Sequence, residues 1–319
     1  MRIAVLGTGR MGTFRAAWLR AHPDVEEVLV GSLRAGTVDA ALDARPDAVV
    51  IASATTDHAA QIRACAERGL PMLCEKPIAL TLRETRAALD VAGDRLQVAF
   101  ERRFDPGFAE ARRLVDAGAL GTLYSVRMIA FDHEPSPEHF IPGSGGIFRD
   151  MHIHDFDAAR WLTGREVEQV YAIGTVRRWE RFAKHGDVDT AAVVLTMDDG
   201  LPVVISGSRH DPRGYDSRAE LLGSEDSIAV GLDARTPLRP VGPSAPAPAA
   251  DPHTAFLERF AAAFDAELRA WLEFVRGERE NPCPGEAALH ALRVAVACDR
   301  SRADGRPVAV ASVSDDDDA

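Results

Sequence analysis

A glycine-rich turn near the amino terminus restricts the fold of this chain more than any other feature. Residues 2–7, RIAVLG, form a short apolar run typical of a buried strand, and residues 8–22 have the pattern of a helix. Between them, GTGRMG places Gly7, Gly9 and Gly12 in the G-x-G-x-x-G spacing. Such glycines permit a tight turn and let a pyrophosphate approach the backbone at the helix amino terminus. The motif predicts a dinucleotide site, although a tight turn in an α/β domain of another function, such as a methyltransferase, has the same spacing.

Strands and helices alternate over the first part of the chain. Further strands are expected at 26–32, 46–53, 71–76 and 96–104, and further helices at 57–69 and 81–93. Thr81 followed by Glu84 has the pattern of a capping box at the start of the last of these helices. This alternation is typical of βαβ units, so we expect an α/β Rossmann domain with a doubly wound parallel sheet over residues 1–120.

The pattern changes after Gly121. Strand-like runs follow one another there, separated by short turns such as DDG and GSED, which predicts a mostly antiparallel sheet. Two helices are expected near the end of the chain, at 253–277 and 285–305. We therefore expect a second, α+β domain over residues 121–311, followed by an acidic tail over residues 312–319.

Composition excludes several classes of protein. The chain has 319 residues and a formal net charge of −12, with no basic patch that could neutralise phosphates, so no nucleic-acid partner is expected. No apolar run approaches the roughly 20 residues of a membrane helix, and no signal peptide precedes the first strand. The four cysteines lack C-x-x-C spacing, which indicates reduced, structural thiols. We expect a soluble, cytoplasmic protein without a membrane partner.

Charged residues are concentrated in SGGIFRDMHIHDFD, residues 144–157. If the run after Gly146 is one helix, Asp150, His154 and Asp157 fall at i, i+4 and i+7, on one stripe of its surface. His152 and Asp155 then lie on a different stripe and are interpreted as bystanders. On such a helix the two histidines are about 200° apart, so they cannot share an ion, and no metal site is expected.

A lysine lies at the predicted ligand-binding edge of the first sheet. CEKP, residues 74–77, ends a predicted strand, which places Lys76 at its carboxyl end, where open α/β sheets bind ligands. A lysine there can donate a hydrogen bond to an alcohol or carbonyl oxygen. The alternative is a surface lysine before a turn proline, and the bond to Pro77 is a candidate cis peptide.

These motifs together resemble one family. RIAVLGTGRMG, VVIASATTDHAAQIRACAERGLPMLCEKPIAL and GGIFRDMHIHDFDAARWLTG are similar to the hallmarks of the glucose–fructose oxidoreductase / inositol dehydrogenase (Gfo/Idh/MocA) family: a Rossmann fingerprint, an E-K-P triplet and a D-x-x-x-H pair. Within the family, AFERRFDPGF, GYDSRAELLGS and FLERFAAAFDAELRAW are similar to bacterial inositol 2-dehydrogenases. The resemblance covers nearly the whole chain, with its motifs in the family's order.

The resemblance implies roles for individual residues. Lys76, Asp150 and His154 match the family's catalytic triad, in which the histidine takes the hydroxyl proton, the aspartate orients it and the lysine polarises the oxygen. The residues implied to bind substrate are Lys76, His133, Asp150, His154, Asp157 and Tyr215. The residues implied to bind the dinucleotide are Gly7, Thr8, Gly9, Arg10, Met11, Gly12, Ser32, Arg34, Ser53, Thr55, His58, Glu75 and Lys76. For Asp157 a helix-surface carboxylate, and for His133 and Tyr215 ordinary strand residues, are the alternatives.

The chain departs from the family pattern at three places. The acidic residue that usually ends the second strand and selects NAD is replaced by Gly-Ser-Leu-Arg at 31–34. Ser32 and Arg34 suit a 2′-phosphate, which favours NADP over NAD, although Arg34 stacking on adenine without selecting is the alternative. Only residues 32–46 separate the second and third strands, which leaves room for one helix. The family pattern normally has a helix, a strand and another helix there. Either the domain is smaller near the adenosine, or the sequence has lost a segment. Glu101 stands where an asparagine is common.

The resemblance implies an NAD(P)-dependent dehydrogenase that assembles through its sheets into a homodimer or homotetramer. The expected reaction is oxidation of a secondary hydroxyl of a cyclic polyol, with myo-inositol giving 2-keto-myo-inositol (scyllo-inosose). One alternative is another sugar or an aminocyclitol precursor as substrate. The other is a dinucleotide-binding sensor without turnover, which the joint presence of Lys76, Asp150 and His154 disfavours.

Overall fold

The computed structural model describes residues 1–317, which form two compact units that are each discontinuous in sequence. The first unit comprises residues 1–100 and 265–292, and the second comprises residues 101–264 and 293–317. The last two residues of the expected acidic tail lie outside the described residues.

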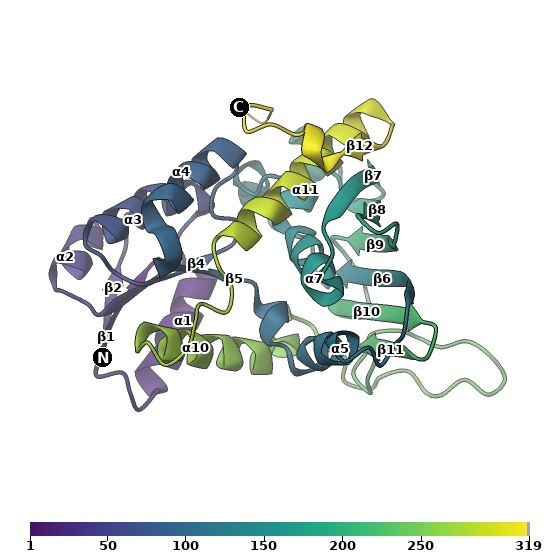
Figure 1. Cartoon of the computed structure of the whole chain (residues 1–319), viewed down its shortest axis with the longest axis horizontal. Helices are drawn as coiled ribbons and strands as arrows, with labels where there is room; N and C mark the ends of the chain where they lie inside the picture. Colours follow the sequence, from purple (N-terminus) through teal and green to yellow (C-terminus); the bar gives the residue numbers. More distant parts are fainter. Residues whose placement is uncertain (318–319) are drawn as a thin grey trace. The chain divides into compact units, whose positions relative to one another are not determined.

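The first unit contains a five-stranded parallel sheet in the order β2-β1-β3-β4-β5 (Figure 1). Its strands are β1 (Arg2–Leu6), β2 (Glu27–Gly31), β3 (Ala48–Ile51), β4 (Met72–Glu75) and β5 (Leu96–Ala99). The helices that connect them are α1 (Arg10–Ala21), α2 (Val38–Asp43), α3 (Thr55–Glu67), α4 (Leu82–Ala92) and the short 3-10 helix η1 (Gly93–Arg95). The predicted alternation of strands and helices is confirmed, and α2 is the one helix expected between the second and third strands.

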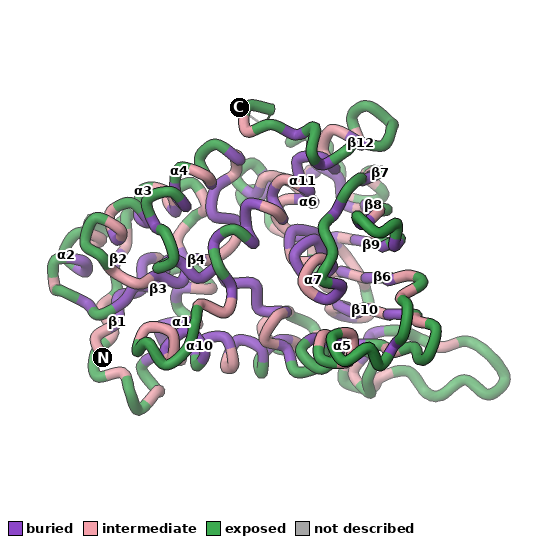
Figure 2. Tube along the Cα trace, viewed as in Figure 1, coloured by how far each residue is buried: buried purple, intermediate pink, exposed green. Residues whose placement is uncertain are grey.

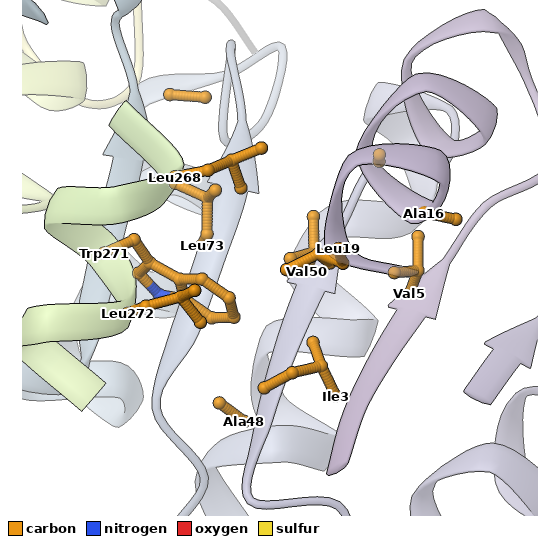
Figure 3. Close-up of a cluster of buried hydrophobic side chains, with 12 residues drawn as sticks. Ile3, Val5, Ala16, Leu19, Ala48, Val50, Leu73, Leu268, Trp271 and Leu272 are labelled. Carbon is orange, nitrogen blue, oxygen red and sulfur yellow. The ribbon is translucent and has the colours of Figure 1, made fainter. Parts of the chain in front are cut away.

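The core of the first unit is completed by a helix from late in the chain. Strands β1 and β3 are buried along almost their whole length, as is typical of a parallel sheet covered on both faces (Figure 2). Helix α10 (Ala261–Val275) contributes Leu268, Trp271 and Leu272 to the same cluster as Val50 and Leu73 of the sheet (Figure 3). Trp271 is fully buried, so the carboxyl-terminal segment is part of this core.

The second unit is built on a seven-stranded sheet in the order β11-β10-β6-β9-β8-β7-β12. Its strands are β6 (Leu123–Phe131), β7 (Val167–Thr175), β8 (Thr190–Met197), β9 (Pro202–Ser208), β10 (Asp216–Gly223), β11 (Ser227–Val230) and β12 (Val308–Ala309). The β6–β9 pair is parallel and the other pairs are antiparallel, so the prediction of a mostly antiparallel sheet is confirmed.

Helices cover one face of this sheet, and α7 packs against β6 and α5 (Figure 1). The helices of the second unit are η2 (Glu101–Phe104), α5 (Pro106–Asp116), η3 (Glu138–Gly143), α6 (Gly146–Asp150), α7 (Ile153–Thr163), α8 (Glu180–Lys184), α9 (Phe256–Arg259), the later part of α11 (Glu286–Asp304) and η4 (Val310–Ser312). The side chain of Asp105 caps α5 by accepting hydrogen bonds from the N–H groups of Gly107 and Phe108.

Three predicted elements differ from the structure. The strand expected over residues 96–104 ends at Ala99, and residues 101–104 form the 3-10 helix η2 instead. The helix expected over residues 253–277 is divided into α9 and α10. The single helix considered for the run after Gly146 is also interrupted, and this break bears on the candidate site.

Two aspartates of the acidic tail pair with arginines of α11. Asp315 lies 3.3 Å from Arg293, and Asp317 lies 3.0 Å from Arg300. The four cysteines are buried free thiols, as expected. Among residues 1–317, none of the helices combines the length and apolar character needed to cross a membrane.

Candidate active site

The glycine turn of the first unit joins β1 to α1. A Cβ at Gly7, whose φ is +119°, would lie 2.3 Å from the carbonyl oxygen of Ala52, and a Cβ at Gly12 would lie 2.1 Å from the carbonyl oxygen of Gly7. Both positions therefore require glycine for close packing of the turn. Around Gly9, by contrast, a Cβ would meet no atom within 4 Å, and no side chain caps the start of α1 there. This open space at a helix amino terminus fits a dinucleotide pyrophosphate.

The other fingerprint residues and the end of β2 lie at the same edge of the sheet, at the carboxyl ends of the strands. Thr8 is exposed in the turn, and Arg10, the first residue of α1, is also exposed. After β2, the N–H of Ser32 donates to the hydroxyl of Thr37 at 3.0 Å, and Arg34 is exposed in the turn that follows. Residues 32–34, directly after β2, thus include a serine and an arginine but no acidic side chain.

The predicted residues after β3 are linked to the segment after β4. Ser53 donates its hydroxyl to Gln61 at 2.8 Å, and Thr55 is the first residue of α3. His58 is buried, with Nδ1 2.9 Å from the carbonyl oxygen of Pro77 and Nε2 3.3 Å from that of Ser53. Burial lowers the pKa of His58, which keeps the ring neutral as a brace between α3 and the loop after β4.

The segment after β4 contains the E-K-P triplet. The Lys76–Pro77 peptide bond is cis. Glu75 accepts two hydrogen bonds, of 3.0 and 2.9 Å, from the fully buried guanidinium of Arg15 on α1. Arg15 also lies 2.5 Å from the equally buried Glu267 on α10. Glu75 therefore ties α1 to β4, whereas Lys76 follows at the carboxyl edge of the sheet, as expected.

In the second unit, the predicted single helix is broken between Asp150 and His154. The N–H groups of both Met151 and His152 bond to the carbonyl oxygen of Ile147, at 3.1 and 3.0 Å, so the chain makes a wider, π-type turn. Asp150 ends α6, and His154 is in the first turn of α7. The expectation of one uninterrupted stripe through both residues was therefore wrong.

The break accompanies the burial of His152. Its Nδ1 lies 2.8 Å from Asp155, which also pairs with Arg102, and all three side chains are almost completely buried. A Cβ at Gly207 of β9 would lie 2.1 Å from Nε2 of this ring, so the sheet has room for His152 only because residue 207 is glycine. Burial disfavours ionisation of Asp155, but Arg102 and His152 outweigh it and hold its pKa at about 2. His152 and Asp155 are thus part of the packed base of α7.

His154 itself is paired with a residue of η2. Its Nδ1 lies 3.1 Å from Oε2 of Glu101, and their side chains are 17% and 7% exposed. Burial opposes ionisation of Glu101, but the nearby charges of His154 and Arg102 prevail and hold the pKa of Glu101 at about 2. The glutamate in place of the family's usual asparagine was the only signal of this pairing in the sequence.

Asp150 and Asp157 are each held by an arginine. Arg209, which follows β9, donates to Asp150 at 2.7 Å and lies 3.8 Å from Asp132. Arg103 of η2 binds both carboxylate oxygens of the buried Asp157, at 2.9 and 2.5 Å. Neither arginine was predicted: Arg209 lies outside the segments quoted above, and nothing in AFERRFDPGF marks Arg103 as the partner of Asp157.

The two remaining candidates occupy loops next to strands. Nδ1 of His133 lies 3.0 Å from the carbonyl oxygen of Asp211. Tyr215 packs edge-on against Phe260, with ring centroids 6.3 Å apart, and burial raises its pKa, so its phenol stays protonated. Both are within the second unit, and their binding of substrate stays a prediction.

Successive residues of η2 thus pair with α7: Glu101 with His154, Arg102 with Asp155, and Arg103 with Asp157. This arrangement fixes α7 at three points and holds the imidazole of His154 against a buried carboxylate. Such a group can accept a proton from a hydroxyl that reaches its other nitrogen.

Comparison with known proteins identifies the family. The model of an oxidoreductase family with an NAD-binding Rossmann fold matches residues 1–100, and that of the GFO/IDH/MocA C-terminal domain matches residues 108–229. The chain belongs to the GFO/IDH/MocA oxidoreductase family. The resemblance inferred from the motifs is therefore confirmed.

Relatives cover this chain over nearly its full length. The myo-inositol dehydrogenase Hyg17 of Streptomyces leeuwenhoekii is 37% identical, over 97% of this chain and 100% of that protein. A probable dehydrogenase from Thermotoga maritima has a similar structure, with a TM-score of 0.89 and 32% identity over 98% and 100% of the two chains. A scyllo-inositol dehydrogenase from Lactobacillus casei, solved with bound NAD(H) and scyllo-inositol, has a TM-score of 0.84 and 26% identity over 98% and 99%.

Proposed function

We propose that this protein is an NAD(P)-dependent dehydrogenase that oxidises a secondary hydroxyl of a cyclic polyol, with myo-inositol as substrate and 2-keto-myo-inositol as product. The observation that carries the proposal is the presence of Lys76, Asp150 and His154 in one chain that both domain models of this oxidoreductase family match. Two of the relatives named above, a myo-inositol dehydrogenase and a scyllo-inositol dehydrogenase, support the substrate class.

The reaction needs a base, because an alcohol that loses a hydride must also lose its hydroxyl proton. In the proposed mechanism, His154 accepts that proton on Nε2, since its Nδ1 faces Glu101. Asp150, which is paired with Arg209, accepts a hydrogen bond from the substrate. Lys76 donates to the oxygen as it becomes a carbonyl. The dinucleotide, when bound, supplies the nicotinamide that accepts the hydride.

For the dinucleotide we propose NADP in preference to NAD. The support is the end of β2, where Ser32 is followed by an exposed Arg34 and the usual acidic residue is lacking. An arginine at this place binds a 2′-phosphate, whereas a carboxylate would repel it. A kcat/KM with NAD that equals or exceeds the value with NADP would overturn this preference.

We also propose that the protein assembles as a homodimer or homotetramer through the outer face of the seven-stranded sheet. Tyr171, Val194 and Val204 lie opposite one another on β7, β8 and β9, and are 39–42% exposed. Ile173, on the same side of β7, is 53% exposed. A contiguous apolar row of this kind marks an interface, and the sheet of a second copy is the complementary surface.

For the compartment we propose the cytoplasm. The support is the four cysteines, which are buried thiols, as is typical of proteins in a reducing compartment.

A substrate panel tests the proposal. Inositol isomers, open-chain sugars and aminocyclitols are incubated with NAD or NADP, and reduced nicotinamide is followed by absorbance. Turnover fastest with myo-inositol is the expected result. Preference for a sugar or an aminocyclitol would replace the substrate, and binding of dinucleotide without turnover of any compound would favour a sensor.

A further inference from the structure

The carboxylate behind His154 comes from a position that the family pattern does not assign to catalysis. Glu101 lies on η2, shortly after the end of β5, and its side chain is only 7% exposed. Its Oε2 lies 3.1 Å from Nδ1 of His154. A buried carboxylate is costly unless it is paired, so this contact has to be maintained in the folded protein.

The contact determines which nitrogen of the ring can act. A neutral imidazole carries one proton, and the nitrogen without it is the one that accepts a proton from another group. An ionised carboxylate has only acceptor oxygens, so Glu101 favours the tautomer of His154 with the proton on Nδ1. Nε2 is then the basic nitrogen of the ring.

The neighbouring pairs keep the glutamate in place. Arg102 pairs with Asp155 and Arg103 with Asp157, so the residues that follow Glu101 in η2 are both anchored on α7. A short helix held in this way cannot turn Glu101 away without breaking two buried ion pairs. The geometry is therefore preorganised before substrate arrives.

We propose that Glu101 is a positioning residue that fixes the tautomer and orientation of His154 and thereby makes Nε2 the proton acceptor. The proposal rests on the proposed function, in which His154 is the base. A glutamine at this position is uncharged and can offer its NH2 group to Nδ1, which would favour the opposite tautomer.

Nuclear magnetic resonance tests the pairing without any need for turnover. The protein is labelled with 15N-histidine, and His154→Ala identifies the signals of His154 among those of the other histidines. At a pH where the ring is neutral, we expect the Nδ1-protonated tautomer in the wild type and a shift toward the Nε2-protonated tautomer in Glu101→Gln. The same tautomer in both proteins would overturn the proposal.

A double-mutant cycle tests the effect on catalysis. We expect Glu101→Gln to lower kcat/KM for polyol oxidation by roughly 10²-fold, within the range that a general base contributes, with unchanged binding of NADP measured by calorimetry. In the His154→Ala background, the same substitution should cause no further loss, because Glu101 acts through His154. Losses that multiply in the double variant would overturn the proposal.

Two further variants serve as controls for these measurements. Glu110→Gln, the same change at an exposed carboxylate of α5, should retain wild-type activity. Glu101→Leu, which removes the carboxylate at similar side-chain size, provides a second variant if Glu101→Gln does not fold, and it is expected to show the same loss. A wild type that turns over no polyol refutes the proposed function, whereas the tautomer measurement still decides the role of Glu101 in orienting His154.

Discussion

Alanine substitutions at Gly9 and Gly12 should damage the protein in two different ways. At Gly9 the added Cβ meets no protein atom within 4 Å, and the backbone, with φ −75° and ψ −172°, suits alanine. We expect Gly9→Ala to change the free energy of unfolding by less than about 1 kcal/mol, the cost of a poorer helix cap. At Gly12 the Cβ would lie 2.1 Å from a carbonyl oxygen, 1.3 Å short of the 3.4 Å at which ordinary contact begins. Backbone must move there, so Gly12→Ala should destabilise the protein by about 3 kcal/mol or more.

Gly9→Ala should weaken dinucleotide binding while leaving the free energy of unfolding nearly unchanged. If the pyrophosphate occupies the space beside Gly9, the new methyl group removes at least one hydrogen bond from backbone to a charged oxygen, worth about 1.5–3 kcal/mol. That corresponds to an increase of roughly 10- to 150-fold in Kd. Calorimetric titration with NAD and NADP measures the Kd, and thermal unfolding followed by circular dichroism measures stability. A Gly9→Ala protein that binds both dinucleotides as tightly as the wild type would refute the assignment of this space to the pyrophosphate.

Three more predictions concern the two units. Trp271→Ala should destabilise the first unit by about 3–5 kcal/mol in urea unfolding, because the side chain is fully buried; a loss below 1 kcal/mol would contradict its place in the core. The pKa of Glu101 falls from 4.5 in the unfolded chain to about 2 in the folded one. Ionised Glu101 therefore contributes on the order of 3 kcal/mol to the free energy of unfolding. This contribution is complete above about pH 5 and is lost as the pH falls through about 2. The stability difference between wild type and Glu101→Gln should therefore shrink on acidification, and a constant difference would argue against the pairing. Val194→Asp combined with Val204→Asp should lower the molar mass measured by light scattering to that of one chain, and an unchanged mass would exclude this sheet face as the interface.

The sequence allowed correct prediction of features set by local pattern. The glycine turn, the strand–helix alternation and the single helix between β2 and β3 depend on residues close together in the chain, and all three are present. The N-cap at Thr81 is also present, with its hydroxyl accepting the N–H of Glu84. Family membership followed from several such motifs in order.

Features set by distant partners could not be predicted in the same way. The break between α6 and α7 depends on a buried His152 that fits only because Gly207, on another strand, lacks a side chain. The pairing of η2 with α7 was hidden because residues 101–104 were expected to continue a strand. Likewise, nothing in the periodicity of α10 indicates that Trp271 completes the core of a sheet formed more than 170 residues earlier, at Leu96–Ala99 and before.

The central claim is that His154 is the base in an NAD(P)-dependent oxidation of a cyclic polyol. The most direct measurement is the initial rate of myo-inositol oxidation by wild type and His154→Ala, each with saturating NADP and with NAD. We predict turnover by the wild type and a loss of roughly 10²- to 10⁴-fold in kcat for the variant, with dinucleotide binding retained. A His154→Ala protein that oxidises myo-inositol at the wild-type rate would contradict the account.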